Sequence, residues 1–381
     1  MNHKDFSKSN KSFPIELLRI LACCMVITIH THLPVKTEDG GYDSSLVLLS
    51  CLIGDAVGIF WLIAGCFRFD KELDYKKTRK TTFKKIVIPM IIVSALVFYI
   101  GGFLEGKTFS ESVSRTGADY ISVLKHLIQW KNPVSGLGHF WYLYVYLLII
   151  LAIPVLHAFV GYLDDHPNAE KVFCIITMLL FCLNDLTLNK TFAFSHHAIN
   201  GAIPGAIEII WGHILYKNRK KLNFRYSSLV WMLLFTVLMI VRWRVQLWLY
   251  SSADTNHMLS WYTSIGLCCA ACLFLTFLKL FENTADQRVK GIVAYIGSKT
   301  FYIYLIHMII YSLFKLYGVK DIVYNLTAEK CTGFVGEILY TVLMTSAVFI
   351  CSFIVSALAD GLKDIGHSLI KRQNSTEQES M

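Results

Sequence analysis

The stretch "IELLRILACCMVITIHTHLP", residues 15–34, decides the fold class of this 381-residue chain. It is apolar over about twenty residues, the length that an α-helix needs to cross a lipid bilayer. Two polar side chains, Arg19 and His30, interrupt the run. Because apolar runs of this length recur along the sequence, we predict an all-α, polytopic integral membrane protein.

The composition points the same way. Hydrophobic residues make up 55% of the chain, charged residues 17%, and the mean hydropathy is +0.50. A soluble globular protein has about 25% charged residues. The net charge of +9 lies in short segments between apolar runs, which favours a role in membrane orientation over nucleic-acid binding. Most of the eleven cysteines lie inside apolar runs, so we expect helix packing rather than disulfides, metal binding or redox chemistry.

About ten transmembrane helices account for the apolar runs. The predicted spans are roughly 14–34, 46–67, 85–104, 140–160, 171–188, 201–217, 226–247, 260–281, 299–317 and 335–358.

The basic segments orient these helices. Residues 68–85, 217–225 and both ends of the chain are rich in Lys and Arg, and an even number of spans places them on one side. Cytoplasmic loops carry an excess of Lys and Arg, so both termini are expected in the cytoplasm. The chain then divides into a cytoplasmic tail 1–13, a membrane domain 14–360 and a cytoplasmic tail 361–381.

Two segments fit this orientation poorly. The acidic stretch 161–171 is placed inside, whereas Arg242 and Arg244 are placed toward the outside. The longest loop, about 105–139, is expected on the outer side, and its length of over thirty residues is typical of a functional loop.

Arg19 and His30 are eleven residues apart. At about 100° per residue they differ by about 20°, so one helix face carries both, about 16 Å apart along the axis. Arginine at the centre of a span costs about 2.5–3.5 kcal/mol on insertion scales, which makes such a residue a candidate for function. The alternative is that Arg19 extends to the lipid headgroups and His30 only ends the helix.

Five further polar or aromatic side chains lie in or beside predicted spans: Asp55, His139, Trp141, Glu208 and His307. Each has a structural alternative. Asp55 could be a charge at a helix start, and Trp141 could belong to an interfacial aromatic belt. Glu208 could form a hydrogen bond between helices, and His307 could serve only in packing.

Several short motifs follow one another in a recognisable order. They are the Arg19, Ala22 and His30 pattern, "IFWLIAGC" at 59–66, His139 with "FWYLY" and Pro154, "WGHILYKNRKK" at 211–221, and Ser298 with "FYIYLIH" ending at His307. Together they resemble membrane acyltransferase family 3, the polytopic O-acyltransferases of surface polysaccharides. The resemblance covers residues 14–360, and it is greatest to the branch without an appended soluble domain.

This resemblance implies a function and a location. The donor would be acetyl-coenzyme A or another acyl-coenzyme A, used as a co-substrate with no bound cofactor. The acceptor would be a hydroxyl of a surface or cell-envelope polysaccharide or of its lipid-linked precursor. The protein would be a multi-pass protein of a bacterial plasma membrane. Two departures stand out: Ala64 replaces the family serine, and Lys84 and Lys85 replace an arginine before Pro89.

A mechanism follows from these residue types. Arg79, Lys84 and Lys85 would attract the phosphates of the donor, and Arg19 would hold its phosphate or pantetheine arm. His30 would act as the general base on the acceptor hydroxyl, because an imidazole titrates near neutral pH. No Ser/His/Asp triad or G-x-S-x-G motif is recognisable, which favours direct transfer over an acyl-enzyme. Candidate acceptor contacts are His139, Trp141, His307, Asp55 and Glu208.

One other class of protein matches the same features. A polysaccharide exporter or transporter also has about ten spans with charges inside the membrane. It differs in chemistry, since an exporter needs neither His30 as a base nor acetyl-coenzyme A. The sequence leaves open the acceptor sugar, the choice between acetyl and succinyl, and the oligomeric state.

Overall fold

The computed structural model describes residues 12–37, 39–69, 72–114, 116–187, 198–252, 259, 262–282, 286–331 and 333–379. The predicted tails therefore lie partly outside the described residues, including Lys4, Lys8 and Lys11. Within the described ranges the secondary structure is helical, apart from one isolated bridge between Lys36 and Tyr42. The all-α prediction is confirmed.

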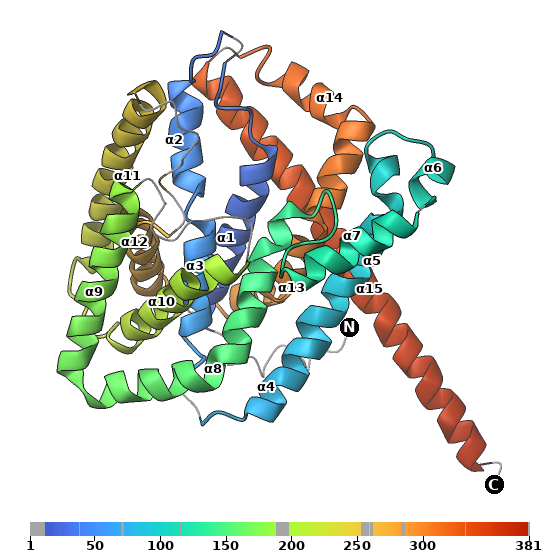
Figure 1. The fold of residues 1–381 in the computed structure, drawn as a ribbon, viewed down its shortest axis with the longest axis horizontal. Helices are drawn as coiled ribbons and strands as arrows, with labels where there is room; N and C mark the ends of the chain where they lie inside the picture. The colour runs from blue at the N-terminus through green and yellow to red at the C-terminus, as the bar shows by residue number, and fades with distance from the viewer. Residues whose placement is uncertain are drawn as a thin grey trace.

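Seven helical stretches are long and apolar enough to cross a membrane (Figure 1). In the described residues they are α1 (Phe13–Thr31), α2 with α3 (Ser44–Gly65), α4 with α5 (Tyr75–Leu104), η3 with α8 (Gly138–Asp165), α11 (Ser227–Ser252), α13 (Gln287–Leu316) and α15 as far as Gly361 (Phe334–Gly361). The remaining predicted positions hold α9 (Pro167–Leu186), α10 (Ala198–Lys217) and the shorter apolar α12 (Ser264–Leu280). A membrane protein with several spans is thus confirmed, while the count of about ten and the sides of the termini stay predictions.

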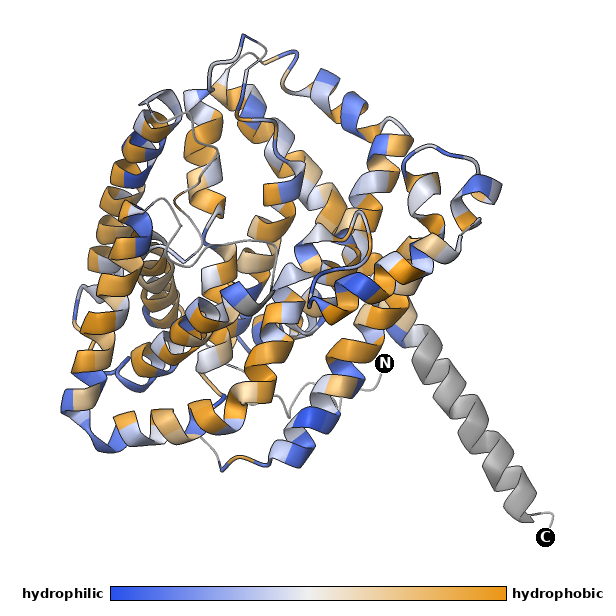
Figure 2. Cartoon of the chain, viewed as in Figure 1, coloured by the Kyte–Doolittle hydropathy of each residue, from blue (hydrophilic) through white to orange (hydrophobic). Residues whose placement is uncertain are grey.

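Helix α1 lies at the centre of the bundle. It packs against α3, α12, α13 and α15, and much of its length is buried. Figure 2 shows apolar residues along the outer faces of the helices and hydrophilic residues gathered at helix ends and loops. Large apolar side chains are exposed on α5, α9, α11 and α15, as expected where helices face lipid.

Helices α3 (Ala56–Gly65) and α10 cross at very close range. A Cβ atom on Gly212 would lie 2.2 Å from the backbone oxygen of Leu62. Only a residue without a side chain allows the two backbones to approach so closely, the packing that small residues provide in membranes. This crossing fixes α3 beside α10 and so places the end of α3 near the site described below.

Three local features differ from the sequence predictions. The second span is two helices, α2 (Ser44–Ile53) and α3, separated by Gly54 and Asp55. The basic segment is not a loop, because α4 (Tyr75–Thr82) and a π-helical turn (Phe83–Val87) lead into α5 (Ile88–Leu104), with Asp74 capping the start of α4. The predicted loop 105–139 contains α6 (Phe109–Val113) and α7 (Gly117–Ile128).

Arg242 is one of the charged residues that lie inside a predicted span. It lies inside α11 and its side chain is fully buried, paired with the equally buried Asp55 at 2.8 Å between Nη1 and Oδ1. A buried carboxylate partner allows the guanidinium to remain inside the bundle, and the side of the membrane toward which Arg242 lies stays a prediction.

Candidate functional site

Three histidines from three separate elements meet near the middle of the bundle. His30 comes from α1, His139 from the short 3₁₀ helix η3 (Gly138–Phe140) and His307 from α13. Their ring centroids are 5.9 Å apart for His30 and His139, 5.4 Å for His30 and His307, and 4.6 Å for His139 and His307. The structure therefore brings together three residues that the sequence singled out separately.

Helix α13 sets the orientation of this cluster. Nδ1 of His307 donates to the backbone oxygen of Tyr304 at 2.7 Å. A carbonyl oxygen only accepts, so in the neutral ring Nε2 carries the lone pair. Nε2 of this fully buried ring has no hydrogen-bond partner among the described residues. The hydroxyl of Tyr304 donates to the backbone oxygen of His139, which ties η3 to α13.

A small cavity of about 50 Å³ adjoins the histidines, and we call it the histidine cavity. Its lining consists of Val26, Ile29, His30, Val57, Phe60, His139, Trp141, Tyr142 and Tyr304. The lining is aromatic and aliphatic apart from the imidazoles and phenol groups. It provides a largely dry space in which an imidazole can exchange a proton with a bound group.

A larger groove of about 430 Å³ adjoins this cavity, and we call it the arginine groove. Arg19, Arg68, Phe67, Ala64 and Ile86 are among its lining residues. The groove shares Phe60, Tyr142 and Tyr304 with the histidine cavity. The two spaces therefore adjoin, with guanidinium groups in one and imidazoles in the other.

The two arginines are held in different ways. Arg19 Nη1 donates to Glu16 Oε1 at 2.7 Å, and its side chain remains 26% exposed. Glu16 fits against α13 because Gly297 has no side chain: a Cβ there would lie 2.1 Å from Glu16 Oε2. Arg68 donates to the hydroxyl of Tyr146 and lies 5.9 Å from that ring centroid.

The sequence reasoning missed Arg68. Arg68 lies in the basic segment 68–85, whose charges were interpreted only as orienting the helices in the membrane. A usable signal was present, since Arg68 comes three residues after the end of α3 at Gly65, within reach of the bundle for a long side chain.

Other predicted site residues lie elsewhere. Asp55 forms an ion pair with Arg242. Glu208 is 2% exposed, and its Oε2 atom has no hydrogen-bond partner in the described part of the chain. Neither lines the histidine cavity or the arginine groove. Trp141, in contrast, lines the histidine cavity.

The predicted donor contacts are also outside the groove. Arg79, Lys84 and Lys85 are exposed, and the Arg79 guanidinium lies 4.9 Å from the ring centroid of Tyr75. Ile86, which follows Lys85, does line the groove. These cations therefore lie near the groove without forming its wall.

His32 provides a contrast with His30. It follows the last residue of α1, and burial lowers the pKa of its imidazole below the ordinary value. It lines neither the histidine cavity nor the arginine groove as described. No group of three or more His, Cys, Asp or Glu side chains in the described residues has a metal-binding arrangement.

Comparison with known proteins gives one match. A family model for acyltransferase family 3, described as an acyltransferase domain, matches residues 14–357. No curated protein and no solved structure matches the chain.

Proposed function

Because the chain belongs to the acyltransferase 3 family of membrane enzymes, we propose that it transfers an acyl group from acyl-coenzyme A to a hydroxyl of a cell-envelope polysaccharide or its lipid-linked precursor. The observation that carries this proposal is the adjoining pair of spaces, with Arg19 and Arg68 in one and His30 and His139 in the other. A long donor with phosphates at one end and a thioester at the other matches this order of groups.

The donor enters from the end of the bundle where α1 begins. The basic segments favour a cytoplasmic position for that end, which is the compartment that supplies coenzyme A thioesters. Arg19 and Arg68 bind the phosphates or amide oxygens of the donor arm, since a guanidinium donates several hydrogen bonds in a fixed fork. The apolar and aromatic walls of the groove hold the arm, and the thioester lies at the histidine cavity.

His30 acts as the general base. It takes the proton of the acceptor hydroxyl while the oxygen forms a bond to the thioester carbonyl carbon. The carbon–sulfur bond then breaks, and the coenzyme A thiolate leaves and receives a proton from the imidazolium. The ester and free coenzyme A are the products, and the imidazole returns to its neutral form.

The acyl group is short and uncharged. The histidine cavity is about 50 Å³ in volume, and no Lys or Arg is among its described lining residues. A carboxylate buried there would lose its hydration without gaining a cationic partner, which is costly. We therefore infer that acetyl-coenzyme A is used in preference to succinyl-coenzyme A.

The acceptor approaches from the side of Trp141 and Tyr142. Both line the histidine cavity, and their flat apolar faces with polar edges suit contact with a sugar ring. His139 also lines the cavity and supplies hydrogen-bonding nitrogens for the sugar hydroxyls, while the His307 ring lies behind it at 4.6 Å between centroids. The enzyme works in this way as a multi-pass protein of a bacterial plasma membrane.

The test is acylation of the glycan, measured by mass spectrometry in cells with and without the gene. The gain of one acyl mass per modified sugar is expected. His30→Ala should lower the transfer rate by about 10²–10⁴-fold, the usual contribution of a general base. His30→Gln should be nearly as poor, because an amide forms hydrogen bonds but takes up no proton.

Two controls keep this test specific. His32→Ala should retain activity, because that ring lies outside both spaces. His307→Ala separates two assignments of the base. If His30→Ala keeps its acyl-transfer activity and His307→Ala loses it, the base is His307 on α13. Full acylation in both variants would reject a histidine as the base. A glycan that carries the same acyl groups with and without the gene would contradict the acyl-transfer proposal and favour an exporter that carries the glycan without modifying it.

A further inference from the structure

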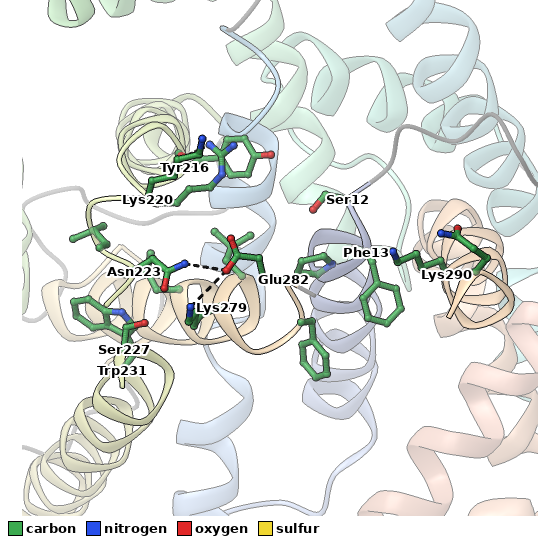
Figure 3. A pocket seen from close by; sticks show the side chains of 17 residues that line it. Ser12, Phe13, Tyr216, Lys220, Asn223, Ser227, Trp231, Lys279, Glu282 and Lys290 are labelled. Atoms are coloured by element: carbon green, nitrogen blue, oxygen red, sulfur yellow. Dashed lines mark hydrogen bonds and ion pairs between the residues drawn. The ribbon is translucent and has the colours of Figure 1, made fainter. Parts of the chain in front are cut away.

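A second large cavity, of about 490 Å³, lies at the end of the bundle where α1 begins (Figure 3). The end of α10, the start of α11, the end of α12 and the start of α13 surround it, together with Phe13 of α1. We call it the basic pocket. The acyl-transfer mechanism above makes no use of it.

Four cations line the basic pocket: Arg219 and Lys220 just after α10, Lys279 in α12 and Lys290 in α13. Among the described lining residues the one carboxylate is Glu282, which accepts from Asn223 Nδ2 at 2.9 Å and lies 3.6 Å from Lys279 Nζ. The pocket thus has an excess of positive charge, as a site for a multiply charged anion requires.

The cations differ in their freedom to bind a ligand. Arg219 is held in place, because its guanidinium lies 3.9 Å from the ring centroid of Tyr216 and donates to the Tyr216 backbone oxygen at 2.6 Å. Lys220 and Lys290 have no carboxylate within ion-pair distance in the described ranges. Their ammonium groups remain available to an anion in the pocket.

Ser227 gives an independent indication of a ligand. It is the first residue of α11, its side chain is fully buried, and its hydroxyl has no hydrogen-bond partner among the described residues. It lines the basic pocket. A buried hydroxyl without a partner is costly to retain, and the start of a helix also carries free backbone N–H groups and a positive dipole end. A phosphate oxygen accepts a hydrogen bond from such a hydroxyl and is attracted by the positive helix end; the backbone N–H of Ser227 itself already donates to the Phe224 oxygen at 3.0 Å.

The walls of the pocket are aromatic. Phe13 and Phe281 lie edge to face with ring centroids 6.0 Å apart, and Trp231 also lines the space. Figure 3 shows Phe13 and Trp231 in the same pocket as the side chains of Lys279 and Lys290. Aromatic faces next to cations suit a ligand that has a flat base as well as phosphates.

The basic pocket lies next to the arginine groove. Tyr216 lines the pocket, and its ring centroid is 5.5 Å from that of Phe67, which lines the groove. Along α1, Phe13 at the pocket precedes Arg19 by about 9 Å, and Arg19 precedes His30 by about 16 Å. Pocket, groove and histidine cavity therefore follow one another along the length of α1.

We propose that the basic pocket binds the phosphorylated adenosine end of coenzyme A, while the pantetheine arm passes Arg68 and Arg19 toward His30. This assignment rests on the proposed function, because it takes coenzyme A as the donor. An anionic lipid headgroup shares the phosphate chemistry and has access to the same end of the bundle, so the experiment separates the two sources.

The first experiment measures binding. Adenosine 3′-phosphate 5′-diphosphate is titrated by calorimetry into the purified full chain in nanodiscs of zwitterionic lipid. Lys220→Gln and Lys290→Gln should each weaken binding by about three- to tenfold, the effect of one partly exposed charge-assisted contact. Lys221→Gln is the matched control, since Lys221 is adjacent, exposed and outside the pocket lining, and it should bind as the wild type does.

Ser227→Ala separates a ligand-binding role from a structural one. Among the residues that the structure describes, the hydroxyl has no partner to lose, so thermal stability without ligand should not fall. Affinity for the nucleotide should fall, because the phosphate loses a hydrogen bond. Lower stability with unchanged affinity would overturn the role of Ser227 as a ligand contact.

The second experiment measures kinetics with two donors, acetyl-coenzyme A and acetyl-pantetheine, which lacks the nucleotide. Lys220→Gln and Lys290→Gln should raise KM for acetyl-coenzyme A and leave KM for acetyl-pantetheine unchanged. An equal effect on both donors that appears only with anionic lipid would overturn the nucleotide assignment in favour of a headgroup. Nucleotide binding that weakens in the variants while the wild type transfers no acyl group would support the pocket and reject the proposed function.

Discussion

The buried pair of Asp55 and Arg242 allows a prediction about stability that also tests a role in acceptor binding. Both side chains are fully buried and joined by one contact of 2.8 Å. Arg242 Nε and Nη2 and Asp55 Oδ2 have no hydrogen-bond partner among the described residues. The pair is therefore incompletely satisfied, and each charge depends on the other.

Removing one partner leaves a buried charge without compensation. Arg242→Met should lower the free energy of unfolding by about 3–5 kcal/mol, the usual cost of breaking such a pair. Asp55→Asn should also destabilise, because it leaves the guanidinium buried and unpaired. The double variant Asp55→Asn/Arg242→Met removes both charges, and its cost should be less than the sum of the two single costs by about 2 kcal/mol or more.

The assay is unfolding of the purified protein in mixed micelles by titration with sodium dodecyl sulfate, for the wild type, both single variants and the double variant. Additive effects of the two single changes would refute the coupling. Acyl transfer by the folded double variant then decides the functional question. Activity near that of the wild type means that Asp55 serves the fold, whereas a stable but inactive double variant restores its predicted contact with the acceptor.

Three further predictions follow from the packing and the two spaces. Gly212→Ala should prevent the normal α3–α10 crossing, because its Cβ would lie 2.2 Å from the Leu62 oxygen; a melting temperature equal to that of the wild type would contradict this. Arg68→Ala should raise KM for acyl-coenzyme A by about tenfold, whereas the exposed Arg79→Ala should change it little, and steady-state kinetics on membranes measures both. Succinyl-coenzyme A should have a lower kcat/KM than acetyl-coenzyme A, and equal values would exclude the uncharged lining at His30 as the basis of selectivity.

The features that sequence could predict are the local ones. Long apolar runs indicate membrane helices because the bilayer sets the length that a span must have. The shared face of Arg19 and His30 follows from the helical period alone, and both residues do line adjoining spaces. The length of the second span was predicted well, but its break at Gly54 and Asp55 was not, and the partner of Asp55 there is Arg242, which is 187 positions away in the chain.

The features that sequence could not predict depend on the packing of distant helices. His139 and His307 are 168 positions apart in the chain, and their meeting requires the contact between η3 and α13 that Tyr304 makes. Basic residues present a different difficulty. Their number indicates which end of the bundle faces the cytoplasm, but it does not distinguish Lys84, which is exposed, from Lys290, which lines a pocket.

Helix α1 explains why the opening stretch was nevertheless informative about function. It is surrounded by α3, α12, α13 and α15, so a polar side chain on it meets other protein elements rather than lipid. Retaining Arg19 and His30 on such a helix is tolerable only where each has protein groups or a ligand beside it. Arg19 forms an ion pair with Glu16 and lines the arginine groove. His30 lies beside the imidazoles of His139 and His307 and lines the histidine cavity. The cost of inserting both residues is thus offset by contacts on the one side of the helix that carries Arg19 and His30.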